Sequence, residues 1–153
     1  MCGRFTLEPP QELYDRSQID NRLDPLVPRY NIAPGQMVPV VIAGRSRRMV
    51  LMRWGLTPHW AKDARGGYHM IDARMETLSQ KLIFRGLLST RRCLVPASGF
   101  YEWKPEGRSK TPYDIHPAAG SWAAFAGLYD MWTNPEGQRS SILPLSPKRP
   151  RPP

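Results

Sequence analysis

The sequence predicts an α+β domain built on a curved, barrel-like sheet of antiparallel or mixed strands, with a few short helices. Strand-like runs outnumber helical ones, and the two are interspersed without a regular β-α-β alternation. The length of 153 residues favours one domain, and a composition of 41% hydrophobic and 10% aromatic residues favours a packed core.

The first half of the chain contains one predicted helix and one predicted hairpin. Residues 8–20 favour a short helix that begins at two prolines, because the first helical turn leaves N–H groups unpaired anyway. A proline-spaced loop follows at residues 25–35. Residues 37–42 and 49–54 are strand-like runs around the segment AGRSRR, which predicts a hairpin with a basic tip.

The second half favours strands. Residues 72–80 have a helical composition with Asp72 as the expected N-cap, and residues 82–89 predict a second short helical turn. From Arg92 onward, four aromatic and β-branched runs follow: RCLVPA, GFYEW, TPYDIH and WAAFAGLYDMW. Pro-Glu-Gly at 105–107 and again at 135–137 predicts two hairpin loops.

The chain divides into a folded domain and a tail. We assign residues 1–138 to the domain. Residues 139–153 form a basic tail with five prolines in the last ten residues, and such a composition predicts disorder.

The composition also limits the partners. The formal net charge of +9 favours nucleic acid or acidic lipid, and a basic surface that serves only solubility is the alternative. The longest apolar stretch, residues 37–43, is too short to span a membrane. The N-terminus lacks the features of a secretory signal, so we expect a cytoplasmic, nucleoid-associated protein.

Cysteine and histidine spacing does not predict a metal site. The two cysteines cannot form a disulfide scaffold, and no Cys-x-x-Cys or closely spaced His pair occurs. We expect Cys93 to be buried and His59, His69 and His116 to be surface or loop residues.

Cys2 is the strongest candidate for chemistry. Methionine aminopeptidases usually remove Met1 before a small residue, so the mature chain is expected to begin with Cys2. An N-terminal cysteine is a 1,2-aminothiol, which can close onto an aldehyde as a thiazolidine ring or attack an amide carbonyl as an N-terminal nucleophile. The alternative is that Cys2 is merely a tolerated small residue.

The neighbours of Cys2 favour the functional interpretation. Gly3 lets the backbone approach a ligand closely, and Arg4 adds a positive charge that favours thiolate and can bind phosphate. A nucleophile beside a phosphate-binding group indicates a nucleic-acid electrophile.

Glu102 and three tryptophans are further candidates. Glu102 lies among aromatic residues in GFYEWK and suits general acid or base catalysis, or it pairs with Lys104 on an exposed strand. Trp54, Trp60 and Trp103 could stack on bases or pack in the core, and Trp60, in the polar segment TPHWAKD, is the one expected to be exposed.

Six motifs together resemble a known family. They are MCGRF, RYNIAPGQ at 29–36, RWGLTPHWAKD at 53–63, DARMETL at 72–78, RRCLVPASGFYEWK at 91–104 and AFAGLYDMW at 124–132. In order and spacing they resemble the SOS response-associated peptidase family, also called abasic site processing proteins, over about residues 1–135.

The resemblance implies a DNA-repair protein that recognises abasic sites in single-stranded DNA. Such a protein crosslinks its mature N-terminal cysteine to the sugar aldehyde as a thiazolidine, without metal or organic cofactor. Its activity is classed as hydrolase or peptidase, because it is thought to remove its own Met1, and as lyase-like. We expect it to act as a monomer.

The resemblance also assigns roles to individual residues. Cys2 corresponds to the crosslinking nucleophile and Glu102 to the catalytic glutamate that assists imine formation and ring opening. The resemblance also implies DNA contacts. Arg4 corresponds to a residue that binds a phosphate near the lesion, and Arg85 to a contact with the DNA backbone. The residues that correspond to the lining of the DNA channel are Pro34, Trp60 and Arg74.

Two departures from the family pattern bear on activity. Asp72 stands where the family has Asn beside the reacting sugar, so an amide donor is lost and we expect slower or weaker crosslinking. The family's later histidine, in a His-Asp-Arg-Met-Pro-like segment, has no counterpart after His116. The tail resembles a frameshifted reading frame or a wrongly assigned gene end, which predicts missing C-terminal strands and an exposed sheet edge.

Two alternatives remain open at this point. One is an N-terminal-nucleophile peptidase or amidohydrolase that acts on peptides in trans. The other is a degenerate, non-enzymatic nucleic-acid binder, which predicts salt-sensitive binding without a covalent adduct.

Overall fold

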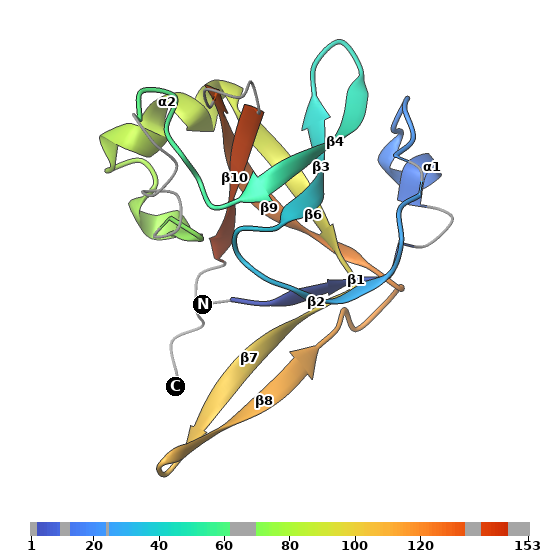
Figure 1. Cartoon of the computed structure of the whole chain (residues 1–153), viewed down its shortest axis with the longest axis vertical. Helices are drawn as coiled ribbons and strands as arrows, with labels where there is room; N and C mark the ends of the chain where they lie inside the picture. Colours follow the sequence, from blue (N-terminus) through green and yellow to red (C-terminus); the bar gives the residue numbers. More distant parts are fainter. Residues whose placement is uncertain (1–2, 10–12, 24, 62–69, 134–138, 147–153) are drawn as a thin grey trace.

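The computed structural model describes residues 3–9, 13–23, 25–61 and 70–133, and the backbone of residues 139–146. Ten strands form two sheets within these ranges (Figure 1). One sheet has the order β2-β1-β7-β8, and its strands are Arg29–Ile32, Phe5–Leu7, Gly99–Glu106 and Ser109–Ile115.

The second sheet curls until its strands meet. Its order is β4-β3-β6-β9-β10-β5, and its strands are Arg47–Trp54, Met37–Ala43, Arg92–Ala97, Ala123–Thr133, Arg139–Ser146 and Ala73–Arg74. β10 pairs with β9 in an antiparallel manner and also with β4 in a parallel manner, so the sheet curves back onto itself. This arrangement confirms the predicted α+β class with a curved, barrel-like, mixed sheet.

The helices are short, as expected. α1 covers Leu13–Ser17, a 3₁₀ turn covers Met75–Thr77 and α2 covers Leu82–Thr90. α1 is shorter than the predicted helix at 8–20, although residues 10–12 lie outside the described residues. None of the helices within the described ranges combines the length and the hydropathy that a membrane span requires.

The main hydrophobic core contains residues from both sheets. Phe5 and Trp54 are among its largest fully buried side chains, and their ring centroids are 5.2 Å apart. Phe125 lies 5.9 Å from Phe5 and 5.8 Å from Phe100. Because Phe5 and Phe100 belong to the four-stranded sheet and Trp54 and Phe125 to the curved one, these aromatic contacts join the two sheets.

Both hairpins predicted within the described ranges are confirmed. β3 and β4 pair in register from Met37↔Arg53 to Ala43↔Arg47, around the basic tip. β7 and β8 pair from Phe100↔Ile115 to Glu106↔Ser109, around the first Pro-Glu-Gly. Gly107 in that loop has a φ of 62°, a conformation that favours glycine. The second Pro-Glu-Gly lies outside the described residues.

The segment from Asp72 onward differs from its prediction. A helix with Asp72 as its N-cap was expected at 72–80, but Ala73–Arg74 form strand β5 and only one 3₁₀ turn follows, with Arg74 at its N-cap. β5 pairs with β10 through Leu145↔Ala73 and Ser146↔Arg74. Strand pairing with a distant segment therefore overrides the helical composition.

The start of the predicted tail is also corrected. Residues 139–146 were expected to be disordered, but they form β10, whose backbone pairs with β9, β4 and β5. Most of the tail's prolines follow residue 146, and Pro144 is accommodated opposite Gly127. Residues 147–153 lie outside the described residues, and the expectation of missing C-terminal strands stays a prediction.

Candidate functional site

Arg4 directly precedes β1, and Glu102 lies on the neighbouring strand β7 of the four-stranded sheet. The Arg4 carbonyl oxygen accepts a hydrogen bond from the Tyr101 backbone N–H at 3.0 Å, which extends the pairing of β1 with β7 beyond Phe5. The Arg4 Nη1 atom donates to Asn31 Oδ1 on β2 at 2.7 Å. The Arg4 guanidinium is therefore bound from β2 and the Arg4 backbone from β7, one residue along the ladder from Glu102. Cys2 itself lies outside the described residues.

Glu102 shares a face of β7 with a core residue. Side chains alternate along a strand, so Glu102 lies on the same face as Phe100, and Tyr101 lies on the opposite face. Glu102 is half-buried and stands opposite Tyr113 of β8. Glu102 is thus partly shielded from solvent, whereas the predicted alternative was an exposed pair with Lys104. Lys104 pairs instead with Glu106, at 3.8 Å.

Pro34 and Asp72 each adjoin a residue that binds Trp54, the last residue of β4, and Arg74 follows on β5. The Gly35 N–H, next to Pro34, donates to the Trp54 carbonyl oxygen at 2.7 Å. The Trp54 indole Nε1 in turn donates to the carbonyl oxygen of Ile71, next to Asp72, at 2.6 Å. Asp72 is half-buried and Arg74 is exposed.

The core joins this group to Arg4 and Glu102. Phe5, which follows Arg4, contacts the Trp54 ring that holds Ile71, and Phe5 is also paired with Phe100. Four of the residues expected at the site belong to this set of aromatic and backbone contacts or directly adjoin its members along the chain: Arg4, Pro34, Asp72 and Glu102. Arg74 lies two residues after Asp72, on β5.

The three candidate tryptophans differ in exposure. Trp60 is 68% exposed and Trp103 is 41% exposed, so both rings are available to a ligand. Trp54 is only 2% exposed, which identifies it as a core residue that holds the site from within. The expectation that Trp60 is exposed is confirmed.

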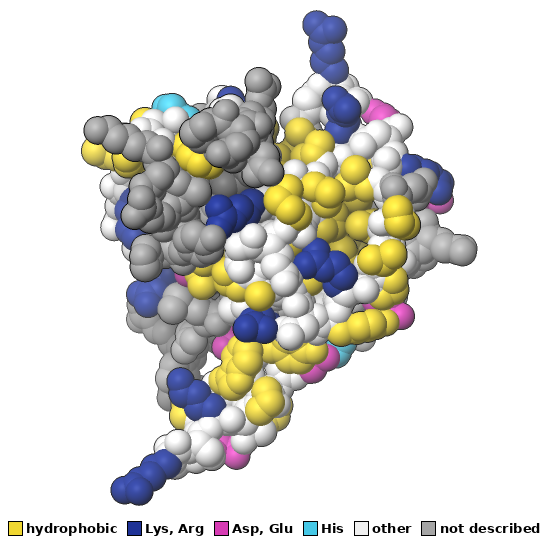
Figure 2. All heavy atoms as spheres, viewed as in Figure 1, with side chains coloured by type: hydrophobic (Ala, Val, Ile, Leu, Met, Phe, Trp, Pro, Cys, Tyr) yellow, Lys and Arg dark blue, Asp and Glu magenta, His cyan; other side chains and the backbone are white. Residues whose placement is uncertain are grey.

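Arg85 stands apart from the other candidates. It is exposed on α2, which packs against β9 and β6. Figure 1 shows α2 at the end of the molecule opposite to the β7–β8 hairpin. Lys and Arg side chains are distributed along the whole face between the tips of the β7–β8 and β3–β4 hairpins (Figure 2).

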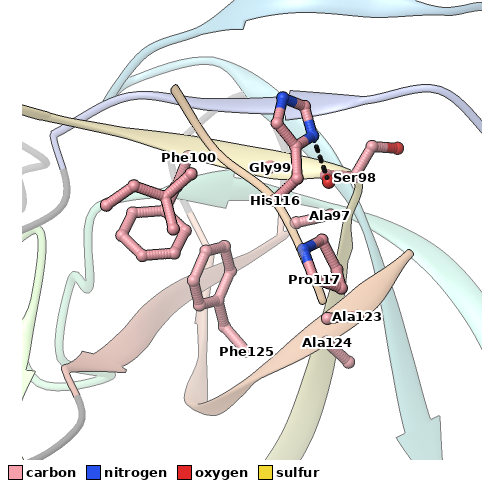
Figure 3. Close-up of a pocket in the computed structure, with 10 residues that line it drawn as sticks. Ala97, Ser98, Gly99, Phe100, His116, Pro117, Ala123, Ala124 and Phe125 are labelled. Carbon is pink, nitrogen blue, oxygen red and sulfur yellow. Dashed lines mark hydrogen bonds between the residues drawn. The ribbon is translucent and has the colours of Figure 1, made fainter. Parts of the chain in front are cut away.

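A small apolar pocket lies where β6 continues into β7. It has a volume of about 180 Å³ and is lined by ten residues that include Phe100, Phe125 and His116 (Figure 3). The His116 ring approaches Gly99 so closely that an added Cβ would lie 2.8 Å from Nδ1, so a side chain at position 99 would displace the ring. None of the described candidate residues lines this pocket.

Both ring nitrogens of His116 face acceptors. Nδ1 lies 3.0 Å from the Ser98 carbonyl oxygen and Nε2 lies 3.0 Å from Asp114 Oδ2. The bond to the Ser98 carbonyl, and then the hydrogen bond and charge of Asp114, raise the pKa of His116. His116 is a loop residue with a 56% exposed side chain, as expected, but its hydrogen bonds were not foreseen.

Cys93 is buried in β6, as predicted. Burial raises the pKa of its thiol to about 12, so it is a neutral, unreactive group at physiological pH. Within the described ranges, no group of three or more His, Cys, Asp or Glu residues could hold a metal ion.

Sequence reasoning missed the residues that hold the candidates in place. Asn31 accepts from Arg4, and Asp130 and Trp132 bind the backbone on either side of Trp60. Their positions within the family motifs are the sequence signal that points to them: Asn31 lies within RYNIAPGQ, and Asp130 and Trp132 lie within AFAGLYDMW. Their partners are distant in sequence, so only the folded structure identifies the contacts.

Comparison with known proteins decides the family. The sequence profile of the family described as SOS response associated peptidase matches residues 1–147. The chain belongs to this family. The match also reaches past the boundary that the composition suggested at residue 138, although the division into domain and tail stays a prediction.

Relatives of this SOS response-associated peptidase family member occur in bacteria and vertebrates. The chain is 45% identical over 142 residues to the abasic site processing protein YoqW of Bacillus subtilis, and the aligned region covers 90% of this chain and 63% of YoqW. It is 33% identical over 141 residues to the abasic site processing protein HMCES of Gallus gallus, and the aligned region covers 72% of this chain and 42% of HMCES. The chain thus spans less than two thirds of the length of these relatives.

Solved structures show the same fold. A protein from Bacteroides thetaiotaomicron superposes with a TM-score of 0.84 at 23% identity, over 95% of this chain and 68% of the other. A phage-related protein from Bordetella bronchiseptica superposes with a TM-score of 0.72 at 28% identity, over 95% of this chain and 69% of the other.

Proposed function

We propose that this protein processes abasic sites in single-stranded DNA by forming a covalent thiazolidine crosslink through Cys2. The observation that carries the proposal is the family match over residues 1–147, together with relatives that are named abasic site processing proteins. The net charge of +9 supports a nucleic-acid partner.

The proposed reaction uses the amine and the thiol of the mature N-terminus. The Cys2 amine adds to the aldehyde carbon of the ring-opened sugar and releases water to form an imine. The thiol then adds to the same carbon, its proton passes to the imine nitrogen, and the thiazolidine ring closes. Overall, one aldehyde and one aminothiol give one thiazolidine and one water.

Glu102 and Arg4 are proposed to serve this reaction. Glu102 acts as the general acid and base that moves protons during ring opening and imine formation, and its half-buried position favours such a role. Arg4 binds a phosphate next to the lesion, and its bonds to Asn31 and β7 support this role because they reduce the freedom lost on binding.

The remaining assignments complete the proposal. Asp72 lies beside the reacting sugar, and the protein acts as a monomer in the cytoplasm, at the nucleoid. It removes its own Met1, which is the hydrolase or peptidase activity, and the crosslinking chemistry is lyase-like. The other proposed DNA contacts are Pro34, Trp60, Arg74 and Arg85.

The proposal is tested with the purified full chain and a single-stranded oligonucleotide that carries one abasic site. Intact mass measurement first establishes whether Met1 has been removed. We expect a heat-stable shifted band on a denaturing gel, which is absent with Cys2→Ala and retained with Cys93→Ala. Cys93 is the matched control because it is the other cysteine of the chain and its thiol is buried.

Other outcomes would favour the alternatives. Reversible, salt-sensitive binding without a band, from a protein with a free N-terminal Cys2, would indicate a non-enzymatic binder. Turnover of peptides without DNA would indicate a peptidase that acts in trans. A covalent band with an intact oligonucleotide would contradict the proposal, because the reaction requires a free aldehyde.

A further inference from the structure

The exposed Trp60 lies between two residues whose backbones are anchored to β9. Residues 54–58 are buried, and the chain emerges at His59 and Trp60, which are exposed. A side chain of β9 binds the backbone of His59, and another binds the backbone of Ala61. Trp60 is therefore a large exposed ring on a fixed segment of backbone.

Asp130 forms the first anchor. Its Oδ2 atom accepts the His59 backbone N–H at 2.8 Å and lies 3.0 Å from His59 Nδ1, and its Oδ1 accepts the Met131 N–H at 2.8 Å. The residue is only 6% exposed. The contact with Nδ1 also orients the imidazole ring of His59 toward β9. The Oδ2 atom thus holds the His59 segment, while Oδ1 is bound to the backbone of β9 itself.

Trp132 forms the second anchor. Its Nε1 donates to the Ala61 carbonyl oxygen at 2.7 Å. Asp130 and Trp132 are two residues apart on β9, so their side chains lie on the same face of the strand. This spacing lets one strand hold the residues before and after Trp60. We call Asp130 and Trp132 the β9 clamp.

We propose that the β9 clamp positions Trp60 for stacking on an unpaired base of single-stranded DNA. This inference rests on the proposed function, in which Trp60 contacts DNA. Aromatic rings stack on unpaired bases of any sequence, and an anchored backbone lowers the conformational entropy that binding removes. Asp130 and Trp132 act through Trp60 and are positioning residues.

A double-mutant cycle with intact single-stranded DNA tests the clamp separately from the crosslinking chemistry. The probe is a fluorescein-labelled mixed-sequence oligonucleotide without an abasic site, and its Kd is measured by anisotropy. The variants are Trp132→Phe and Asp130→Asn, each with Trp60 present and in a Trp60→Ala background. Trp132→Phe keeps an aromatic ring and removes the indole N–H together with part of the ring volume, and it remains informative if Asp130→Asn does not fold.

We expect Trp60→Ala to raise Kd by about 5- to 150-fold, the range measured for base–aromatic stacking. Each clamp variant should raise Kd by roughly 2- to 12-fold when Trp60 is present. Without the clamp, the Trp60 side chain has to be immobilised on binding, and the entropy lost weakens affinity by about that factor. In the Trp60→Ala background the same variants should leave Kd unchanged, because the clamp acts through the missing ring.

Each contrary result has a distinct meaning. If the clamp variants raise Kd equally in both backgrounds, or leave Kd unchanged with Trp60 present, the clamp does not act through Trp60 and the inference is overturned alone. If Trp60→Ala binds like the wild type, Trp60 is not a DNA contact, and both this inference and that part of the proposed function are overturned. Thermal unfolding of each variant identifies a general loss of structure, which would lower Tm and affect both backgrounds.

Discussion

Trp54 donates its indole N–H to the carbonyl oxygen of Ile71 at 2.6 Å, and this bond fixes the residue that precedes Asp72. The Trp54 ring also contacts Phe5, and the Trp54 backbone carbonyl oxygen accepts a hydrogen bond from the Gly35 N–H. A buried core residue thus links three segments of the candidate site that are distant in sequence.

Replacement of Trp54 should weaken both the fold and the site. Trp54→Phe leaves the Ile71 carbonyl oxygen without this donor and reduces core volume, so we expect the free energy of unfolding to fall by about 1–3 kcal/mol. Urea denaturation measures this change. Trp103→Phe, at a 41% exposed position, is the control and should change stability by less than about 0.5 kcal/mol. Equal effects of the two substitutions would contradict the role of Trp54.

Asp72→Asn should speed crosslinking. The substitution restores an amide donor and removes a negative charge close to the proposed path of the DNA phosphates. A gain of roughly 1 kcal/mol at close range corresponds to about fivefold tighter binding at low salt. The crosslinking rate and the Kd for intact single-stranded DNA are compared with those of Asp15→Asn, which makes the same charge change on α1. A similar gain with both variants would show that the gain comes from the change in net charge and not from the position of Asp72.

Arg4→Ala should lower the salt dependence of DNA binding. Loss of one phosphate contact reduces the slope of log K against log salt by about 0.7 for a single strand. Arg45→Ala, at the exposed tip of the β3–β4 hairpin, is the matched control and should leave the slope closer to that of the wild type. An unchanged slope with Arg4→Ala would contradict a phosphate contact at this residue.

His116 should make stability depend on pH. The Ser98 carbonyl and Asp114 raise the pKa of His116 in the folded protein, so folding favours the protonated ring. This stabilisation is complete below the unfolded-state pKa near 6.5 and is lost as pH rises through the higher folded-state pKa. Urea midpoints of the wild type and His116→Gln should therefore differ most at low pH and converge above that range. Parallel pH profiles would show that the bonds of His116 do not contribute.

The residues that carry the proposed chemistry were identified from local sequence. Cys2 was singled out because an N-terminal cysteine combines an amine and a thiol, and Arg4 because it adds a charge nearby. The β3–β4 hairpin and the strand containing Glu102 followed from alternating and aromatic patterns. These features depend on residue types and short spacings, which are local properties of the chain.

The segment after Asp72 shows where local reasoning fails. Its composition favours a helix, but pairing with β10 draws residues 73–74 into a strand, and β10 itself was expected to be disordered. A strand at the edge of a sheet is stabilised by backbone hydrogen bonds from its neighbour, so a weak local preference can be overridden. The sequence contains no local indication of which edges are available.

The sequence by itself therefore determined the fold class, the family and the candidate residues, since each of these depends on pattern and motif. Only the tertiary structure decided which side chains hold these candidates in place. Asn31 beside Arg4, Trp54 beside Ile71, and Asp130 and Trp132 around Trp60 are contacts between residues 17 to 71 positions apart. Such contacts form when strands are brought side by side, because the register of the sheets, and not distance along the chain, sets which groups meet.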